Sequence, residues 1–279
     1  MDDALVGAAI GCAIVAGVCW LLGVITKEQS WVDRVWSLTP IGYVAWFAWQ
    51  TGFSDTRLVV MTALVAAWGA RLTFNFARKG GYAKGGEDYR WAVLRKKMTP
   101  LQFQLFAFVF IAGIQNLILL LISLPAWAAI EGAGRPLGAL DALAAVAFLV
   151  LLAGETIADN QQWRFHQAKR RAVERGETVD PAFCTTGLFR WSRHPNFFCE
   201  QGMWWAFYLF AVSATGRWLH PAIIGPAVLT ALFHGSTNFT ESITLSKYPS
   251  YAAYQRSTSR LWPWPPRDGS VGLERGRPA

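Results

Sequence analysis

The stretch that decides the fold class is residues 4–25, which read ALVGAAIGCAIVAGVCWLLGVI without a single charged residue. An apolar helix of this length crosses the ~30 Å hydrocarbon core of a bilayer. The stretch is longer than the roughly 7–15-residue apolar core of a cleaved signal peptide. It also follows Asp2 and Asp3 rather than basic residues, and it ends without an Ala-x-Ala site. The sequence therefore predicts a retained membrane-spanning helix.

The composition extends this interpretation to the whole chain of 279 residues. Hydrophobic residues make up 53% and charged residues only 16%, whereas soluble domains have about 25% charged residues. The 15 Trp, 18 Phe and 7 Tyr are typical of membrane interfaces. Further apolar windows lie at about 36–53, 58–77, 101–130, 140–158, 197–215 and 219–245. We predict an all-α polytopic bundle of about seven transmembrane helices.

The net charge of +8 is distributed unevenly between the loops that join these predicted spans. All but four of the 26 basic residues fall on one side; Arg57, Arg135 and Arg217 fall on the other, and Arg71 lies within a span. Because cytoplasmic loops retain Lys and Arg, we predict an outside N-terminus, a cytoplasmic C-terminus and an inner-membrane location. Membrane topology accounts for the basic excess, so no nucleic-acid partner is expected.

The sequence predicts a single transmembrane domain over residues 1–264 and a disordered cytoplasmic tail over residues 265–279, which is rich in Gly, Pro and charge. The four cysteines form no Cys-x-x-Cys motif, and no pair of His has metal-ligand spacing. We therefore expect unpaired thiols and no metal. Membrane lipids are the expected surroundings, and no obligate protein partner is inferred.

Polar residues recur at helical spacing inside three of the predicted spans. An ionisable side chain in lipid costs roughly 2.5–3.5 kcal/mol, so a charge at this depth marks a candidate site. We expect the three stripes to converge on one cavity facing the basic side; the alternative is that they pair with one another only to hold the bundle together. The stripes are Glu155, Asp159, Gln162 and His166; Arg71, Asn75 and Arg78; and His234, Asn238 and Glu241.

The densest polar run is Gly187-Leu-Phe-Arg-Trp-Ser-Arg-His-Pro-Asn-Phe-Phe-Cys-Glu200. Pro195 suits the first position of a helix, so a helix is predicted to begin there. Its free backbone N–H groups and the neighbouring guanidiniums favour an anion such as phosphate. Alternatively, the arginines serve only the charge asymmetry of the membrane. The residues concerned are Arg190, Arg193 and the cap His194 outside the helix, with Asn196 and Glu200 on one helical face.

A second polar loop, residues 78–90, contains two glycine pairs that would let its backbone approach a ligand closely. The loop lacks the Gly-Lys-Ser/Thr ending of a P-loop, and no G-x-G-x-x-G follows a strand pattern. The nucleotide-binding motifs of soluble proteins are therefore absent from the sequence, and the loop by itself does not define a site.

Three polar segments of the chain follow one another in a recognisable order. They read Glu155-Thr-Ile-Ala-Asp-Asn-Gln-Gln-Trp-Arg-Phe-His166, then Gly187-Leu-Phe-Arg-Trp-Ser-Arg-His-Pro-Asn196 with Glu200, then Glu241 followed by Tyr248-Pro-Ser-Tyr-Ala-Ala-Tyr254. Over roughly residues 67–264 the chain resembles the steroid 5-alpha-reductase superfamily, specifically its bacterial branch. The Arg-His-Pro before a helix and the tyrosine-rich ending are shared with membrane methyltransferases of isoprenylcysteine and phospholipids.

The resemblance implies a seven-helix reductase that holds NADPH in a cytosol-facing cavity and passes hydride to a conjugated C=C bond of a lipophilic enone. It places Asn196 and Glu200 at the nicotinamide end, with Glu200 as a candidate catalytic residue. Asp159 belongs to the implied cofactor wall, and Gln162 continues the same helical face. The candidate phosphate or ribose contacts are Arg78, Arg164, Arg170, Arg171, Arg190, Arg193 and His194.

The chain departs from this family's pattern at the substrate end. Steroid reductases of the family place a Glu in the second span and a Tyr in the third to polarise the substrate ketone. Here residues 36–53 contain no acid, and Trp68 stands at the third-span position. The nearest polar residues are Asp33, Arg34 and Tyr43, so Asp33 and Tyr43 are the remaining catalytic candidates.

Two other functions fit the same sequence features. One is S-adenosylmethionine-dependent methyl transfer to a membrane lipid or prenyl group, because unrelated activities share one fold. The other is a non-enzymatic transporter or lipid-binding membrane protein. Binding of NADPH, of S-adenosylmethionine or of neither distinguishes the three.

Overall fold

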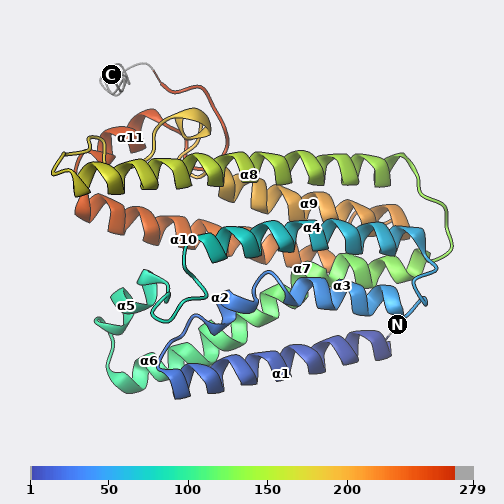
Figure 1. The fold of residues 1–279 in the computed structure, drawn as a ribbon. Helices are drawn as coiled ribbons and strands as arrows, with labels where there is room; N and C mark the ends of the chain where they lie inside the picture. The colour runs from blue at the N-terminus through green and yellow to red at the C-terminus, as the bar shows by residue number, and fades with distance from the viewer. Residues whose placement is uncertain (1, 268–279) are drawn as a thin grey trace. The chain divides into compact units, whose positions relative to one another are not determined.

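The computed structural model describes residues 2–267, which contain helices and loops and no strand (Figure 1). The predicted all-α fold class is confirmed, with about 75% of the described residues helical. The helices are α1 (Asp2–Thr26), α2 (Trp31–Val35), α3 (Thr39–Trp49), α4 (Thr56–Arg78), α5 (Tyr89–Arg95), α6 (Pro100–Phe106), α7 (Gln115–Ala129), α8 (Ala139–Glu174), α9 (Pro195–Thr215), α10 (Ile224–Lys247) and α11 (Tyr251–Ser257), with a π-helix at Ala107–Ile114 and 3-10 helices at Ile130–Gly132, Gly187–Arg190 and Pro221–Ile223. Arg267, in the predicted tail, donates its backbone N–H to the Ser257 carbonyl at 2.9 Å; residues 268–279 of that tail lie outside the described residues.

Four helical stretches are long and apolar enough to cross a membrane: Asp2–Thr26, Thr56–Arg78, Pro100–Gly132 and Ala139–Glu174. Large apolar side chains on these helices remain exposed, among them Ile14, Leu105 and Val150. A soluble protein rarely leaves so much apolar helix surface in water, whereas lipid solvates it. The four helices therefore indicate a membrane protein.

The other three predicted spans are not both long enough and apolar enough by the same criteria. The window 36–53 contains α3, whose 11 residues are too few to cross ~30 Å of hydrocarbon. Pro40 lies in the first turn of α3, where proline starts a helix rather than continuing one. With 21 and 24 residues, α9 and α10 are long enough, but their composition is more polar than that of the four. Seven spans, and the orientation of the termini, stay a prediction.

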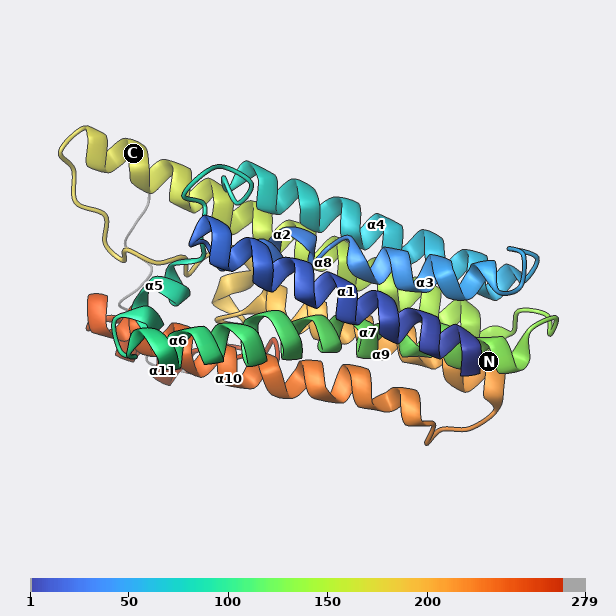
Figure 2. The same cartoon turned by 90° about the horizontal axis from the view of Figure 1, so that it is seen from below.

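The described chain divides into two compact units. The first unit contains residues 2–147 and 204–229, and the second contains residues 148–203 and 230–267, so α8, α9 and α10 each contribute to both. In the first unit, α1, α3, α4 and α7 pack against one another (Figures 1 and 2). The single domain predicted over residues 1–264 stays a prediction.

Close packing between α7 and the start of α10 depends on a glycine. Gly225 is the second residue of α10, and a Cβ atom there would overlap the backbone carbonyl of Leu121. Small residues allow helix backbones to approach closely in membranes, where packing rather than hydrophobic burial drives association.

Gly225→Ala is therefore expected to destabilise the protein by about 1–3 kcal/mol, because the added methyl group meets a backbone atom that cannot rotate away. Gly235→Ala is the matched control on the same helix, since no atom lies within 4 Å of its ideal Cβ. The control should be neutral or stabilising by up to about 1 kcal/mol. Unfolding in detergent micelles measures both, and equal stabilities would contradict the packing described.

The three arginines predicted to lie opposite the basic side all have partners within the first unit. Arg57 donates from Nε to Asp141 Oδ1 at 2.7 Å and from Nη2 to Oδ2 at 3.1 Å, and both side chains are buried, at 2% and 3% exposure. Asp141 also accepts from the Ser213 hydroxyl at 2.7 Å and the Gly138 N–H at 2.8 Å. The other two pairs are Arg217 with Glu131, and Arg135 with the Ala214 carbonyl.

A π-helix at Ala107–Ile114 joins α6 to α7 in one continuous helical stretch. The Gln115 N–H reaches back to the Phe110 carbonyl, five residues earlier, which is the bonding pattern of a π-helix. Asn116, buried just after it, donates its side-chain amide to the Ala112 carbonyl at 2.8 Å. Pro125 lies inside α7 and does not end it.

Candidate functional site

The second unit contains a buried ion-pair network at the base of α9. As predicted, α9 begins at Pro195. Arg193 donates from Nε and Nη2 to the two carboxylate oxygens of Glu241 at 2.7 and 3.1 Å, and His194 Nε2 lies 2.9 Å from the same carboxylate. The Arg193 and Glu241 side chains are only 9% and 7% exposed. The ring of His194 therefore faces α10 instead of capping α9.

Arg193 also holds the chain that follows α10. Its Nη1 donates to the Gln255 carbonyl at 3.0 Å and to the Thr258 carbonyl, while the Gln255 side chain donates to Glu241 at 2.9 Å. Most of the guanidinium N–H groups thus bind the protein itself. In this structure Arg193 positions the segment 255–258, and the sequence-based assignment of Arg193 to a phosphate stays a prediction.

Aromatic residues fix α11 against the loop that precedes α9. Tyr254 donates its hydroxyl to the Phe189 carbonyl, and Tyr251 donates to Glu241 at 3.3 Å. The Phe183 ring contacts both tyrosines, with its centroid 4.9 Å from that of Tyr251. Burial raises the pKa of Tyr251 and of Tyr254 above the ordinary value, so both hydroxyls stay protonated and act as donors.

Backbone hydrogen bonds continue this attachment along the C-terminal segment. The Arg193 N–H donates to the Ser259 carbonyl at 2.8 Å, and the His194 N–H donates to the Arg260 carbonyl at 3.1 Å. The Trp264 N–H returns a bond to the Trp191 carbonyl at 3.0 Å. Residues 258–264 are thereby held beside the start of α9.

The segment held in this way encloses a basic cavity of about 360 Å³, which we call the arginine cavity. Four arginines and three hydroxyl residues line it, and no acidic side chain does. Among the described residues, no carboxylate forms an ion pair with Arg256 or Arg267, and Arg260 donates to the amide oxygen of Asn238. The lining residues are Arg193, Gln255, Arg256, Ser257, Thr258, Ser259, Arg260, Trp264, Pro265 and Arg267.

The predicted nicotinamide-binding residues lie where α8 and α9 pack closely. Asn196 donates from Nδ2 to Asp159 Oδ1 at 3.5 Å, so the polar faces of the two helices meet. A Cβ atom on Gly154 would lie 2.9 Å from Cys199 Sγ, and that close approach explains the glycine. These two contacts show that α8 and α9 run antiparallel. Glu200, one turn after Asn196, therefore lies at the same level as Glu155.

Both carboxylates at that level, Glu155 and Glu200, are buried, as is Asp159. Buried acids within apolar helices are costly and are typical of binding or catalytic sites. Gln162 is half-buried on the same face of α8, while His166 is exposed. The stripe on α8 thus runs from buried to exposed, as the sequence predicts.

The remaining predicted cofactor contacts of the second unit are exposed arginines. Arg164, Arg170 and Arg171 lie on the last turns of α8, and Arg190 ends the 3-10 helix before α9. None of the four lines the arginine cavity. Their assignment to phosphate or ribose stays a prediction.

The other predicted site residues belong to the first unit. Arg78, at the end of α4, donates from Nε and Nη2 to the Asn75 side-chain oxygen at 2.9 and 2.7 Å. Asp33 accepts from the Trp91 indole at 3.3 Å, and burial raises the pKa of its carboxyl. Tyr43 is buried in α3, and its hydroxyl has no hydrogen-bond partner among the described residues. Their convergence with the polar stripes of the second unit stays a prediction.

The glycine-rich loop 78–90 is explained by its own packing. A Cβ atom on Gly86 would overlap the Gly80 carbonyl, so the turn closes only with glycine there. Glu28 accepts from the Gly85 N–H at 2.9 Å and pairs with Arg34 at 2.7 Å, and Arg34 donates to the Gly81 carbonyl. The glycine pairs therefore serve the fold of the loop.

The arginine cavity was not predicted from the sequence. Three of its arginines contributed only to the count of basic residues on each side of the membrane, namely Arg256, Arg260 and Arg267. A signal was present, because no acidic residue occurs between Glu241 and Asp268 while these three arginines fall within that interval. What the sequence did not reveal is the fold of this segment back onto residues 191–194.

Comparisons with known proteins cover most of the chain. A family model described as "Protein of unknown function (DUF1295)" matches residues 19–258, a range that includes the Arg193 network and five of the ten residues that line the arginine cavity. The uncharacterized protein C594.04c of Schizosaccharomyces pombe is 38% identical over 265 residues, which cover 90% of this chain and 77% of the yeast protein. No solved structure matches.

Proposed function

Because the chain belongs to the DUF1295 family, whose description assigns no activity, we propose from the chemistry of the second unit that it is an NADPH-dependent membrane reductase. Its substrate class is a lipophilic enone of steroid or isoprenoid type. In this proposal the chain has seven spans and the second unit's basic end faces the cytoplasm of an inner membrane. The observation that carries the proposal is the arginine cavity at the base of α9.

The arginine cavity has the chemistry that the phosphates of a dinucleotide require. Guanidinium groups bind phosphate oxygens with two parallel hydrogen bonds, and hydroxyl groups add further donors. Arg256 and Arg267 have no acidic partner among residues 2–267, so their donors are available to a ligand. Ligand pockets have volumes of roughly 300–1,000 Å³, so this cavity suits the phosphate-bearing part of the cofactor.

The Asn196–Asp159 pair supports the other end of the proposed site. Asp159 takes one N–H of the Asn196 amide, which leaves the Asn196 Oδ1 and its second N–H for a carboxamide such as that of nicotinamide. Arg193, three residues before Asn196, lines the arginine cavity, so one short segment of chain connects both ends.

NADPH, when bound, supplies the hydride that adds to the β-carbon of the enone. The protein then has to donate a proton or a hydrogen bond at the substrate oxygen as charge develops. Asp33 is one of the proposed catalytic residues, and burial raises the pKa of its carboxyl. Glu200 and Tyr43 remain the other proposed catalytic residues.

The arginine cavity does not favour the methyltransferase alternative. S-adenosylmethionine contains a cationic sulfonium and no phosphate, so a cavity lined by four arginines repels its charged centre.

The proposal is tested by titrating the detergent-purified chain with NADPH and with S-adenosylmethionine while following thermal unfolding. We expect NADPH alone to raise the melting temperature. Arg256→Gln combined with Arg267→Gln should weaken NADPH binding by about 100-fold, since each removes a charge-assisted hydrogen bond. Lys84→Gln with Arg175→Gln removes the same charge from exposed positions outside the cavity and should leave binding unchanged.

Three results would contradict the proposal or its site. A shift with S-adenosylmethionine and none with NADPH would favour methyl transfer, and no shift with either would favour a non-enzymatic role. If NADPH binds but the control variant weakens it as much as the cavity variant does, the phosphates bind elsewhere.

A further inference from the structure

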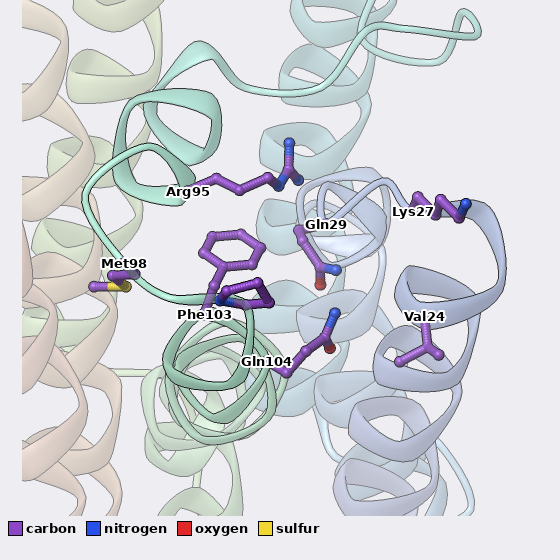
Figure 3. Close-up of a pocket in the computed structure, with 8 residues that line it drawn as sticks. Val24, Lys27, Gln29, Arg95, Met98, Phe103 and Gln104 are labelled. Atoms are coloured by element: carbon purple, nitrogen blue, oxygen red, sulfur yellow. The ribbon is translucent and has the colours of Figure 1, made fainter.

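A second cavity lies in the first unit, where α1 ends and α6 begins (Figure 3). Its volume is about 220 Å³. The residues that line it are Val24, Lys27, Gln29, Arg95, Met98, Pro100, Phe103 and Gln104. None of these residues belongs to the site proposed for the cofactor, so this cavity needs its own explanation.

The walls of this cavity combine apolar and polar side chains. Val24, Met98 and Phe103 supply the apolar surface. The side-chain amides of Gln29 and Gln104 point toward one another in Figure 3. Gln29 is fixed there, because its Nε2 donates to the Gly23 carbonyl at 3.4 Å.

The charged residues that line the cavity are positive. Arg95 lies over the Phe103 ring at 4.8 Å and pairs with Glu87 at 2.8 Å, so its charge is partly balanced. Lys27 adds a second cation, and the exposed Lys96 and Lys97 follow Arg95 directly in the chain. Glu87 is the acidic residue in contact with this group, which leaves an excess of positive charge.

The cavity also lies at the ends of two candidate membrane spans, where the headgroups of a bilayer are expected. Asp2–Thr26 and Pro100–Gly132 are both long and apolar enough to span a membrane, and the cavity occupies the end of one and the start of the other. Exposed Ile25 and Leu101 are sequence neighbours of its lining and continue the apolar surface outside it. An acyl chain attached to a group held in the cavity would therefore meet apolar helix surface.

We propose that this cavity binds an anionic phospholipid, with the headgroup phosphate at Lys27 and Arg95 and an acyl chain against the exposed faces of α1 and α6. The excess of cations selects an anionic headgroup over a zwitterionic one, because each basic residue near a membrane surface attracts anionic lipid. The apolar part of the lining selects a lipid over a free anion, since inorganic phosphate gains nothing from Val24, Met98 or Phe103.

The test uses native mass spectrometry of the detergent-purified full chain with phosphatidylglycerol, phosphatidylcholine or inorganic phosphate added. We expect bound phosphatidylglycerol and no comparable adduct with the other two. Lys27→Gln combined with Arg95→Gln should weaken phosphatidylglycerol binding by about thirtyfold. Lys84→Gln combined with Arg175→Gln removes equal charge outside the cavity and should change binding less than twofold.

Two single substitutions keep the test informative if the double variant fails to fold. Lys27→Gln leaves the Arg95–Glu87 pair intact and should still weaken binding several-fold. Met98→Gln leaves every charge in place and should weaken the lipid adduct by removing apolar contact. Equal binding of both lipids, displacement of the lipid by inorganic phosphate, or equal effects of the cavity and control variants would overturn the proposal.

Discussion

Arg193→Ala is expected to lower the free energy of unfolding by about 3–5 kcal/mol, because it leaves the buried Glu241 carboxylate without its main partner. The same change frees the carbonyls of Gln255 and Thr258, so the segment that carries the arginine cavity loses its attachment. In this variant NADPH should therefore no longer raise the free energy of unfolding. Denaturant unfolding in mixed micelles, with and without NADPH, measures both effects.

A surface ion pair in the same unit provides the control for Arg193. Arg175 and Glu177 are 59% and 52% exposed, and Arg175→Ala should leave stability nearly unchanged. Arg193→Met combined with Glu241→Leu should recover part of the lost stability, because replacing both members of a buried pair leaves no uncompensated charge. Losses of similar size in the Arg193 and Arg175 variants would show that the network contributes little.

The second large effect is expected for Asp141→Ala in the first unit. The substitution leaves Arg57 buried and uncompensated and removes the acceptor for Ser213 and for the Gly138 N–H. A loss of about 3–5 kcal/mol follows, again from the cost of an unpaired buried charge. Thermal unfolding in micelles should show it without any change in nucleotide binding, since Asp141 lies outside the second unit.

Glu131→Gln is the matched control at this end of the first unit. Glu131 pairs with Arg217, but the side chains are 28% and 54% exposed, so the pair is largely solvated. Its loss should cost less than about 1 kcal/mol. An Asp141 variant as stable as the Glu131 variant would mean that burial of the Arg57–Asp141 pair has little energetic weight.

The long apolar helices could be predicted because each corresponds to one continuous segment of the sequence. Residues 4–25 and 58–77 correspond closely to α1 and α4, since a mainly apolar composition over about 20 residues determines which segments enter lipid. The predicted span at 36–53 stays a prediction, because the structure has there only the 11-residue helix α3. Its apolar residues are interrupted by a turn before α3, and proline at position 40 restarts the helix, which hydropathy averaged over a window does not detect.

The site was predictable only where local sequence determines it. The start of α9 at Pro195 and the shared face of Asn196 and Glu200 follow from proline geometry and helical spacing. The Arg193–Glu241 pair was not predicted, because its partners are 48 residues apart in the chain. The sequence suggested phosphate as the ligand of Arg193, whereas the tertiary structure supplies a carboxylate.

The π-helix at Ala107–Ile114 has a consequence for length variation within the family. Removing one residue from an ordinary helix rotates every later side chain by about 100° around the axis, which would turn the buried face of α7 toward lipid. The π-helix can accommodate the loss or gain of one residue without rotating α7, because its i→i+5 hydrogen bonds already include an extra residue per turn. Single-residue insertions and deletions among relatives should therefore concentrate between positions 107 and 114.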